Sequence, residues 1–211
     1  PTGTEFLDLI SPQYVSDLVC WGAIGARTAE SQVHRELTSG LSCPIGIKNS
    51  TKGDIQIAID AIKSSQYQHV FLGTTKKGKV AIFKTSGNDD THIILRGGLE
   101  PNYHPNDIEN CRETLEENKV NANIMVDFSH GNSQKNHENQ KKVSASICEQ
   151  IASGNNDIIG VMIESHLKEG NQKISENMEY GKSITDACVN WEETKKLLDD
   201  LAQSVKARRK N

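Results

Sequence analysis

Short apolar segments of strand length alternate with longer amphipathic segments along nearly the whole chain, and this alternation constrains the fold most strongly. The strand-length segments lie at residues 5–9, 21–26, 44–48, 91–97, 123–130 and 157–165. The helical patterns lie at residues 12–19, 29–39, 54–65, 106–118, 133–151 and 191–208. Strands that alternate with helices in this way predict an α/β protein with a parallel sheet buried on both faces.

One segment interrupts the alternation. Residues 69–75 and 80–86 form two further strand patterns, and Gly78 lies in the short connection between them. This arrangement predicts a β-hairpin inserted over residues 69–86. Such a hairpin has no part in closing a parallel sheet, so we expect a role in dimerisation or in regulation by an effector. A decorative insertion without function is the alternative.

Six strand–helix units fit either an open doubly wound sheet or a TIM barrel. The glycine-rich phosphate-binding patterns typical of the open sheet, GxGxxG and GxxxxGK[ST], are missing from the sequence. A (β/α)8 barrel needs eight strands and about 250 residues. We therefore predict that residues 1–211 form one domain that holds strands 3 to 8 of a barrel, with strands 1 and 2 upstream of Pro1.

Composition excludes several classes of protein. The chain is 35% hydrophobic and 25% charged, with a net charge of −4 and a pI near 6.0. These values give no sign of a nucleic-acid or membrane-surface protein, and no apolar stretch is long enough to span a bilayer. The five cysteines are scattered and never spaced as CxxC, which predicts reduced thiols and a cytoplasmic protein.

Three cations lie at the ends of three predicted strands: Arg27, Lys48 and Arg96. Each alone would most simply be a salt-bridged surface residue. In a parallel barrel, however, the carboxyl ends of the strands meet at the functional face. Together the three cations predict a pocket for a ligand that carries phosphate and carboxylate groups.

The next strands end in residues that can bind metal. His130 ends one strand, Glu164 ends the next, and Asp186 follows in a loop. One imidazole and two carboxylates predict a divalent metal of the manganese, iron, cobalt or zinc class. Strand alternation places Asp127 on the opposite face from His130, so Asp127 and Ser129 are expected to anchor the strand end.

The other histidines receive simpler interpretations. His166 lies two residues beyond Glu164 and is a candidate for contact with the metal ligands. The remaining five are interpreted as hydrogen-bonded core or surface residues: His34, His69, His92, His104 and His137.

Long motifs carry a resemblance to a known family. They lie at residues 22–49, 92–103, 126–133, 158–172 and 180–194. Together they closely resemble type I 3-deoxy-D-arabino-heptulosonate-7-phosphate (DAHP) synthases, over essentially the whole chain. The resemblance implies a metal-dependent (β/α)8 barrel that condenses phosphoenolpyruvate with erythrose 4-phosphate, the first step of the shikimate pathway to aromatic amino acids.

The resemblance also implies roles for residues. It places Ala26, Arg27, Lys48 and Arg96 around phosphoenolpyruvate, and makes His130, Glu164 and Asp186 metal ligands, with Asp186 also beside the substrate. Lys48 is expected to act as a general acid. The family's fourth ligand, a cysteine in a GPCS motif, and its KPRT segment for erythrose 4-phosphate are absent here. We therefore expect the segment alone to be inactive and poorly stable.

The family is commonly inhibited by an aromatic amino acid. The resemblance implies that this effector binds near the hairpin, at positions that match Gln13, Leu37, Ser42, Phe71, Gly73 and Phe83. A glycine at position 73 suggests room for a phenolic hydroxyl, which favours tyrosine over phenylalanine. A homo-oligomer is also expected.

Two other functions remain open. The first is a related synthase that condenses phosphoenolpyruvate with another sugar phosphate. The second is a catalytically dead module that binds an amino acid. The presence of all three cations and all three metal-binding residues argues against the second.

Overall fold

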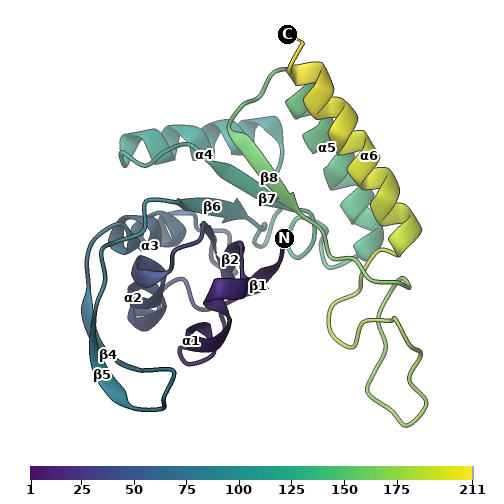
Figure 1. Ribbon diagram of the computed structural model, residues 1–211. Helices are drawn as coiled ribbons and strands as arrows, with labels where there is room; N and C mark the ends of the chain where they lie inside the picture. Colours follow the sequence, from purple (N-terminus) through teal and green to yellow (C-terminus); the bar gives the residue numbers. More distant parts are fainter. Residues whose placement is uncertain (211) are drawn as a thin grey trace. The chain divides into compact units, whose positions relative to one another are not determined.

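The computed structural model describes residues 1–210, which fall into two compact units (Figure 1). Unit one contains residues 1–94 and 111–123, and unit two contains residues 95–110 and the chain from 124 onward. Among the described residues, no helix is both long enough and apolar enough to cross a membrane.

Parallel strands form the centre of unit one. Strands β1 (Gly3–Glu5), β2 (Trp21–Ile24), β3 (Ile45–Lys48) and β6 (Thr91–Leu95) pair in that order. The register places Ile24 beside Ile47, and Lys48 beside Ile94. The strands are rich in buried β-branched residues, as expected for a parallel sheet covered on both faces.

The helices within residues 1–123 follow the predicted order, and the last of them begins in unit two and ends in unit one. They are α1 (Pro12–Val15), extended by the 3-10 turn η1 (Ser16–Leu18), then α2 (Gln32–Gly40), α3 (Gln56–Ser65) and α4 (Pro105–Glu117). Helix α3 buries Ala58, Ile59 and Ile62 on one face. The Asp54 carboxylate accepts a hydrogen bond of 2.8 Å from the Gln56 N–H, so it satisfies one of the free donors at the start of α3.

The predicted hairpin is confirmed. Strands β4 (Val70–Thr74) and β5 (Val80–Lys84) form a separate antiparallel sheet. Gly78 turns the chain with φ +70°, a conformation that glycine adopts at little cost. On one face the rings of Phe71 and Phe83 stack with centroids 6.0 Å apart. The other face leaves four aliphatic side chains strongly exposed: Val70, Leu72, Val80 and Ile82.

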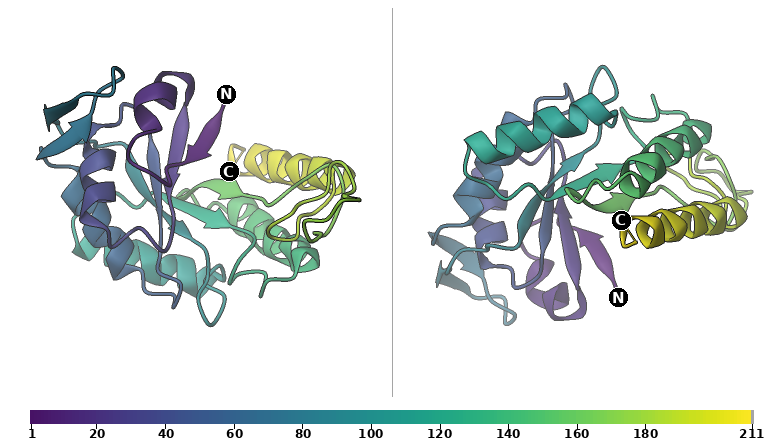
Figure 2. Two further views of the ribbon diagram at one scale, coloured as in Figure 1. Left: turned by 90° about the horizontal axis from the view of Figure 1, so that it is seen from below. Right: turned by 90° about the horizontal axis from the view of Figure 1, so that it is seen from above.

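Unit two pairs β7 (Ile124–Asp127) with β8 (Ile158–Met162) in parallel. The 3-10 turn η2 (His137–Asn139) leads into α5 (Gln140–Ala152), and α6 (Trp191–Arg208) ends the described chain. Figure 2 shows from two sides that α5 and α6 run alongside each other. The Asn190 side chain caps α6 by accepting a hydrogen bond from the Glu193 N–H at 2.8 Å.

Several boundaries differ from the sequence prediction, and two of the differences have a clear local cause. The strand predicted over residues 5–9 is β1, which ends at Glu5, because the Asp8 carboxylate accepts hydrogen bonds from the N–H groups of Ile10 and Ser11 and turns the chain. The helix predicted over residues 133–151 begins only at Gln140. Gln134 and Lys135 are left-handed, with φ of 53° and 60°, which interrupts a right-handed helix.

Candidate active site

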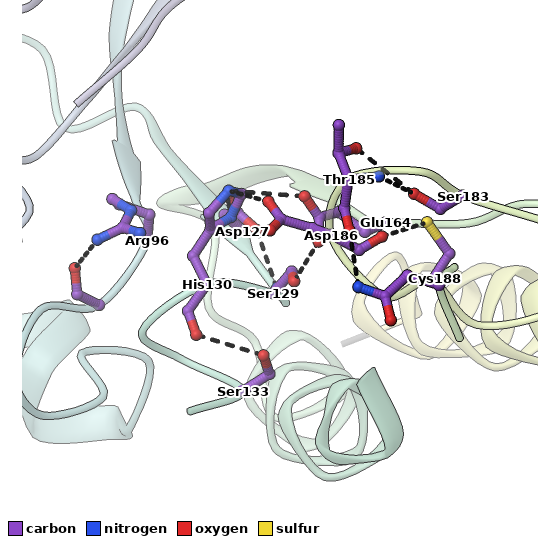
Figure 3. A network of polar contacts seen from close by, with 12 residues as sticks. Arg96, Asp127, Ser129, His130, Ser133, Glu164, Ser183, Thr185, Asp186 and Cys188 are labelled. Atoms are coloured by element: carbon purple, nitrogen blue, oxygen red, sulfur yellow. Dashed lines mark hydrogen bonds and ion pairs between the residues drawn. The ribbon is translucent and has the colours of Figure 1, made fainter. Parts of the chain in front are cut away.

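The chain turns sharply after β7, and this turn sets the direction of the His130 side chain. His130 has φ +54°, in the left-handed region that few residues other than glycine adopt. This turn brings the His130 Nδ1 atom within 2.8 Å of the Asp127 Oδ2 atom (Figure 3). The prediction that Asp127 and His130 lie on opposite faces is therefore wrong. Strand alternation applies only to extended backbone, and the strand has already ended at Asp127.

This contact determines which imidazole nitrogen is available to a ligand. Asp127 is completely buried, and its other oxygen accepts a hydrogen bond of 2.9 Å from the Ser129 N–H. A carboxylate beside Nδ1 favours the tautomer protonated there, which leaves the Nε2 lone pair free. Nε2 lies 3.5 Å from Glu164 Oε1 and 3.7 Å from Asp186 Oδ2.

Glu164 is held at both its side chain and its backbone. The Ser129 hydroxyl donates a hydrogen bond of 2.6 Å to Glu164 Oε2. The buried Gln140 amide bonds the Glu164 backbone twice, donating to its carbonyl and accepting from its N–H, each at 3.0 Å. Burial raises the pKa of the Glu164 carboxyl above its usual range, against the opposing effect of the Ser129 hydrogen bond. A nearby cation would favour the ionised form.

Asp186 reaches the cluster from the long loop between β8 and α6. Its side chain is 70% exposed, whereas those of His130 and Glu164 are 22% exposed. The loop is tied back by the Val189 N–H, which donates to the Glu164 carbonyl at 3.0 Å. The Cys188 thiol donates to the Asp186 carbonyl at 3.5 Å. Asp186, the most exposed of the three, thus lies on a loop whose backbone is hydrogen-bonded to the backbone of Glu164.

The three residues fit a divalent metal. One atom from each of His130, Glu164 and Asp186 lies within 4.8 Å of the others. Two atoms that bind one metal, each about 2.1 Å from it, lie about 3.0–3.5 Å apart, so the separations of 3.5 and 3.7 Å from His130 Nε2 need only a small contraction. One nitrogen and carboxylate oxygens suit manganese, iron, cobalt or zinc.

The predicted cations lie in different units. Lys48 is the last residue of β3 and is buried, and Arg27 lies in the exposed turn after the neighbouring β2, next to the half-buried Ala26. Both belong to unit one. Arg96 belongs to unit two, where its Nη1 donates to the Gly97 carbonyl at 3.4 Å. Within unit two the structure brings together His130, Glu164 and Asp186.

Other histidines have structural partners. His166 is exposed, and its Nδ1 accepts a hydrogen bond from the Leu167 N–H at 2.8 Å, so the ring bonds its own loop. His92 is buried and lies 3.2 Å from the Trp21 Nε1 atom, which donates to it. Burial lowers the pKa of His92 to about 4. His92 is therefore a neutral core residue, as the sequence indicated.

A cavity of about 710 Å³ lies beside the hairpin in unit one. Five residues of the predicted effector set line it: Gln13, Leu37, Phe71, Gly73 and Phe83. Ser42 does not line it. A Cβ atom at Gly73 would lie 2.8 Å from the Phe83 ring, so the glycine admits this ring and does not leave empty space.

Parallel strand–helix units whose strand ends carry the reactive side chains are typical of (β/α)8-barrel enzymes. The chain belongs to the DAHP synthetase I family, whose family model matches residues 1–199.

Two relatives from Escherichia coli K12 illustrate the similarity. The Phe-sensitive phospho-2-dehydro-3-deoxyheptonate aldolase is 58% identical over 211 residues, and the Trp-sensitive enzyme is 51% identical over 210 residues. Each alignment covers 99% of this chain, and the chain spans 60% of each relative.

A solved structure agrees. The phospho-2-dehydro-3-deoxyheptonate aldolase of Francisella tularensis SCHU S4 matches with a TM-score of 0.96 and 55% identity, over 99% of this chain and 61% of that one. The predicted fold, part of a (β/α)8 barrel with an inserted hairpin, is confirmed.

The sequence did not reveal every residue that shapes the site. Gln140 and Ser129 both bond Glu164, from 24 and 35 residues away in the chain. No local pattern marks such a contact, because it depends on how the helix and strand ends pack.

Proposed function

We propose that this chain supplies metal ligands and phosphoenolpyruvate-binding cations to an enzyme that condenses phosphoenolpyruvate with erythrose 4-phosphate. The products would be DAHP and phosphate, in the first step of the pathway to aromatic amino acids. The observation that carries the proposal is the convergence of His130, Glu164 and Asp186 in a chain of the DAHP synthetase I family.

The residues suit the steps of this reaction. Carbon C3 of phosphoenolpyruvate bonds to the aldehyde carbon, water adds at C2, and the C2–O bond to phosphate breaks. Arg27 and Arg96 would hold the phosphate and carboxylate in register by bidentate hydrogen bonds. Lys48 would deliver a proton to the alkoxide formed from the aldehyde. A divalent metal held by the three ligands would polarise the aldehyde oxygen.

The hairpin cavity is proposed to bind an aromatic amino acid that inhibits the enzyme. The named sensitivity of the two E. coli relatives, to phenylalanine and to tryptophan, supports this class of effector. The rings of Phe71 and Phe83 offer an apolar wall, while Gln13 and the buried Glu36 can bond the amino and carboxyl groups. The position of the Phe83 ring removes the steric reason for preferring tyrosine.

Activity is tested by joining the upstream part of the E. coli Phe-sensitive relative before Pro1. We expect phosphoenolpyruvate consumption that requires erythrose 4-phosphate, stops with EDTA, and is lost in His130→Ala. His104→Ala, an exposed histidine outside the cluster, is the matched control. Because the joined part brings the KPRT segment of the relative, the sugar phosphate is tested on this protein's own full-length chain, where turnover only with a different sugar phosphate would support the related synthase. Binding of an amino acid without any turnover would support the dead module.

The effector site is tested by calorimetry with phenylalanine, tyrosine and tryptophan. Phe83→Ala removes apolar contact worth about 1.5–3 kcal/mol, so affinity should fall roughly 10- to 100-fold. Ile82→Ala, on the exposed face of the same strand, should change it less than about twofold. Equal effects of the two variants would place the effector elsewhere. The homo-oligomer and the cytoplasmic location stay predictions.

A further inference from the structure

Asn132 lies where two turns of unit two meet. One turn follows β6 and carries Arg96, and the other follows β7 and carries His130. The buried Asn132 Nδ2 donates to the Leu95 carbonyl at 3.1 Å and to the Asp127 carbonyl at 2.8 Å. Its Oδ1 accepts from the Asn102 N–H at 2.8 Å. One side chain therefore bonds the ends of two strands and the loop beyond the first.

The backbones of the two turns are bonded as well. The N–H groups of Gly131 and Asn132 both donate to the Arg96 carbonyl, at 3.0 and 3.3 Å. The Asn102 Oδ1 accepts from the Gly97 N–H at 2.7 Å. Asn102 thus donates its N–H to Asn132, and its side-chain oxygen accepts from the residue after Arg96.

Glycines permit this close approach. A Cβ atom at Gly97 would lie 2.5 Å from the Asn132 nitrogen, and one at Gly131 would lie 2.7 Å from the Gly97 carbonyl carbon. Gly97 also has φ +74°. The two turns therefore pack backbone against backbone. The Arg96 and His130 side chains both extend from this packed pair of turns.

We propose that Asn132 is a positioning residue that makes the Arg96 turn and the His130 turn a single cooperative unit. Loss of its side chain would then loosen both turns together and misplace the proposed metal ligand. The role of His130 as a ligand rests on the proposed function, whereas the joining of the turns does not.

Asparagine suits this position for a chemical reason. Its amide supplies two donors and an acceptor, and all three are used here. In Asn132→Asp an oxygen would replace the donor group and face the Leu95 and Asp127 carbonyls in a buried site. This variant keeps the shape, replaces the two donors by an acceptor and adds an ionisable group.

Unit one offers a matched control. Asn88 is 6% exposed against 3% for Asn132, and its Nδ2 donates to the carbonyls of Thr38, Leu41 and Cys43 at 3.1–3.2 Å. Asn88→Asp thus makes the same buried change where no candidate ligand is bonded. An effect that came from the buried Asn→Asp change alone would appear in both variants.

The experiment measures amide hydrogen exchange by NMR and Mn²⁺ affinity by calorimetry. In Asn132→Asp the Gly97 and Gly131 amides should both exchange roughly tenfold faster, and Mn²⁺ affinity should fall roughly 10- to 100-fold, as for other partners that orient metal ligands. In Asn88→Asp both amides and the Mn²⁺ affinity should match the unmodified chain.

A milder variant covers the case in which Asn132→Asp does not fold. Asn102→Ala removes the side-chain oxygen that accepts from the Gly97 N–H and leaves Asn132 in place, yet a joined unit predicts faster exchange at Gly131 as well. Faster exchange at Gly97 alone would overturn the proposal, as would equal effects of Asn88→Asp. If the unmodified chain binds no Mn²⁺, the proposed metal site fails, but the exchange data still decide the role of Asn132.

Discussion

The end of β7 and the interior of β6 each present a histidine, in very different surroundings. His130 leaves the strand in a left-handed turn, with Asp127 at Nδ1 and two further carboxylates near Nε2. His92 stays within its strand and is buried beside Gly46, where Trp21 donates to it. Burial without a charged partner keeps His92 neutral. Three carboxylates lie around His130 instead, at 2.8–3.7 Å from its ring nitrogens.

The comparison shows that the neighbours of an imidazole, and not its burial alone, decide whether it can serve as a ligand. Both rings are partly or wholly withdrawn from water. Of the two, His130 has one nitrogen 2.8 Å from a buried carboxylate and the other within 3.7 Å of two further carboxylates. The following predictions test this contrast, starting with the largest expected effect.

Replacement of His130, the proposed metal ligand, should have the largest effect on Mn²⁺ affinity. His130→Ala should lower Mn²⁺ affinity by more than the roughly 10- to 100-fold typical of changes to outer partners. His92→Gln, which keeps an acceptor for Trp21, should leave Mn²⁺ affinity unchanged. Calorimetry on the two variants measures this directly. A similar loss in both would break the distinction.

Replacement of the Asp127 carboxylate tests what orients His130. In Asp127→Asn the side-chain amide can present N–H to Nδ1, which moves the imidazole proton to Nε2, where a metal would bind. We expect Mn²⁺ affinity to fall roughly 10- to 100-fold. NMR of the imidazole nitrogens should show the change of tautomer. Retention of the Nδ1–H tautomer with unchanged affinity would contradict the assigned role.

Acid should destabilise the fold through His92. Its folded pKa near 4 lies below the usual 6.5, so the unfolded chain binds more protons between these values. The stabilisation is complete above pH 6.5 and is lost as the pH falls towards 4, by about 2 kcal/mol at pH 5. Urea unfolding from pH 7 to 5 measures this loss.

The same titration of His92→Gln provides the control for the pH effect. Other groups, including Glu164 with its raised pKa, titrate in both proteins and cancel in the difference. The variant should therefore lose about 2 kcal/mol less than the unmodified chain over the same range. Identical pH dependence in the two proteins would rule out His92 as the cause.

The smallest effect is expected at Ser129. Ser129→Ala removes one hydrogen bond to the Glu164 carboxylate, worth about 1 kcal/mol, and should weaken Mn²⁺ binding roughly fivefold. Ser133→Ala, whose hydroxyl bonds the His130 carbonyl at 3.3 Å, is a nearby control and should have less effect. A larger loss at Ser133 would show that the turn, and not Glu164, is the sensitive part.

The sequence predicted the order of strands and helices and the hairpin, because each depends on local periodicity. It also proposed a metal-binding set from two strand ends and one loop. Apolar runs end where the backbone leaves the covered sheet, so the polar residues that follow mark the functional face. This reasoning identified His130, Glu164 and Asp186, whose atoms the structure brings within 4.8 Å of one another.

The failures arose where the backbone leaves regular geometry. The contact between Asp127 and His130 was missed because a left-handed residue cannot be inferred from strand alternation. The late start of α5 has a similar cause in Gln134 and Lys135. The bonds of Gln140 and Asn132 were missed because they join segments that only tertiary packing brings together.

The left-handed backbone at His130 has a consequence for anyone who re-engineers this chain. A residue with a Cβ atom in that conformation costs roughly 1 kcal/mol relative to glycine. A search for thermostabilising substitutions would therefore rank glycine highly at position 130, and that substitution would remove the imidazole. Thermal stability and the proposed metal binding therefore favour different residues at this position.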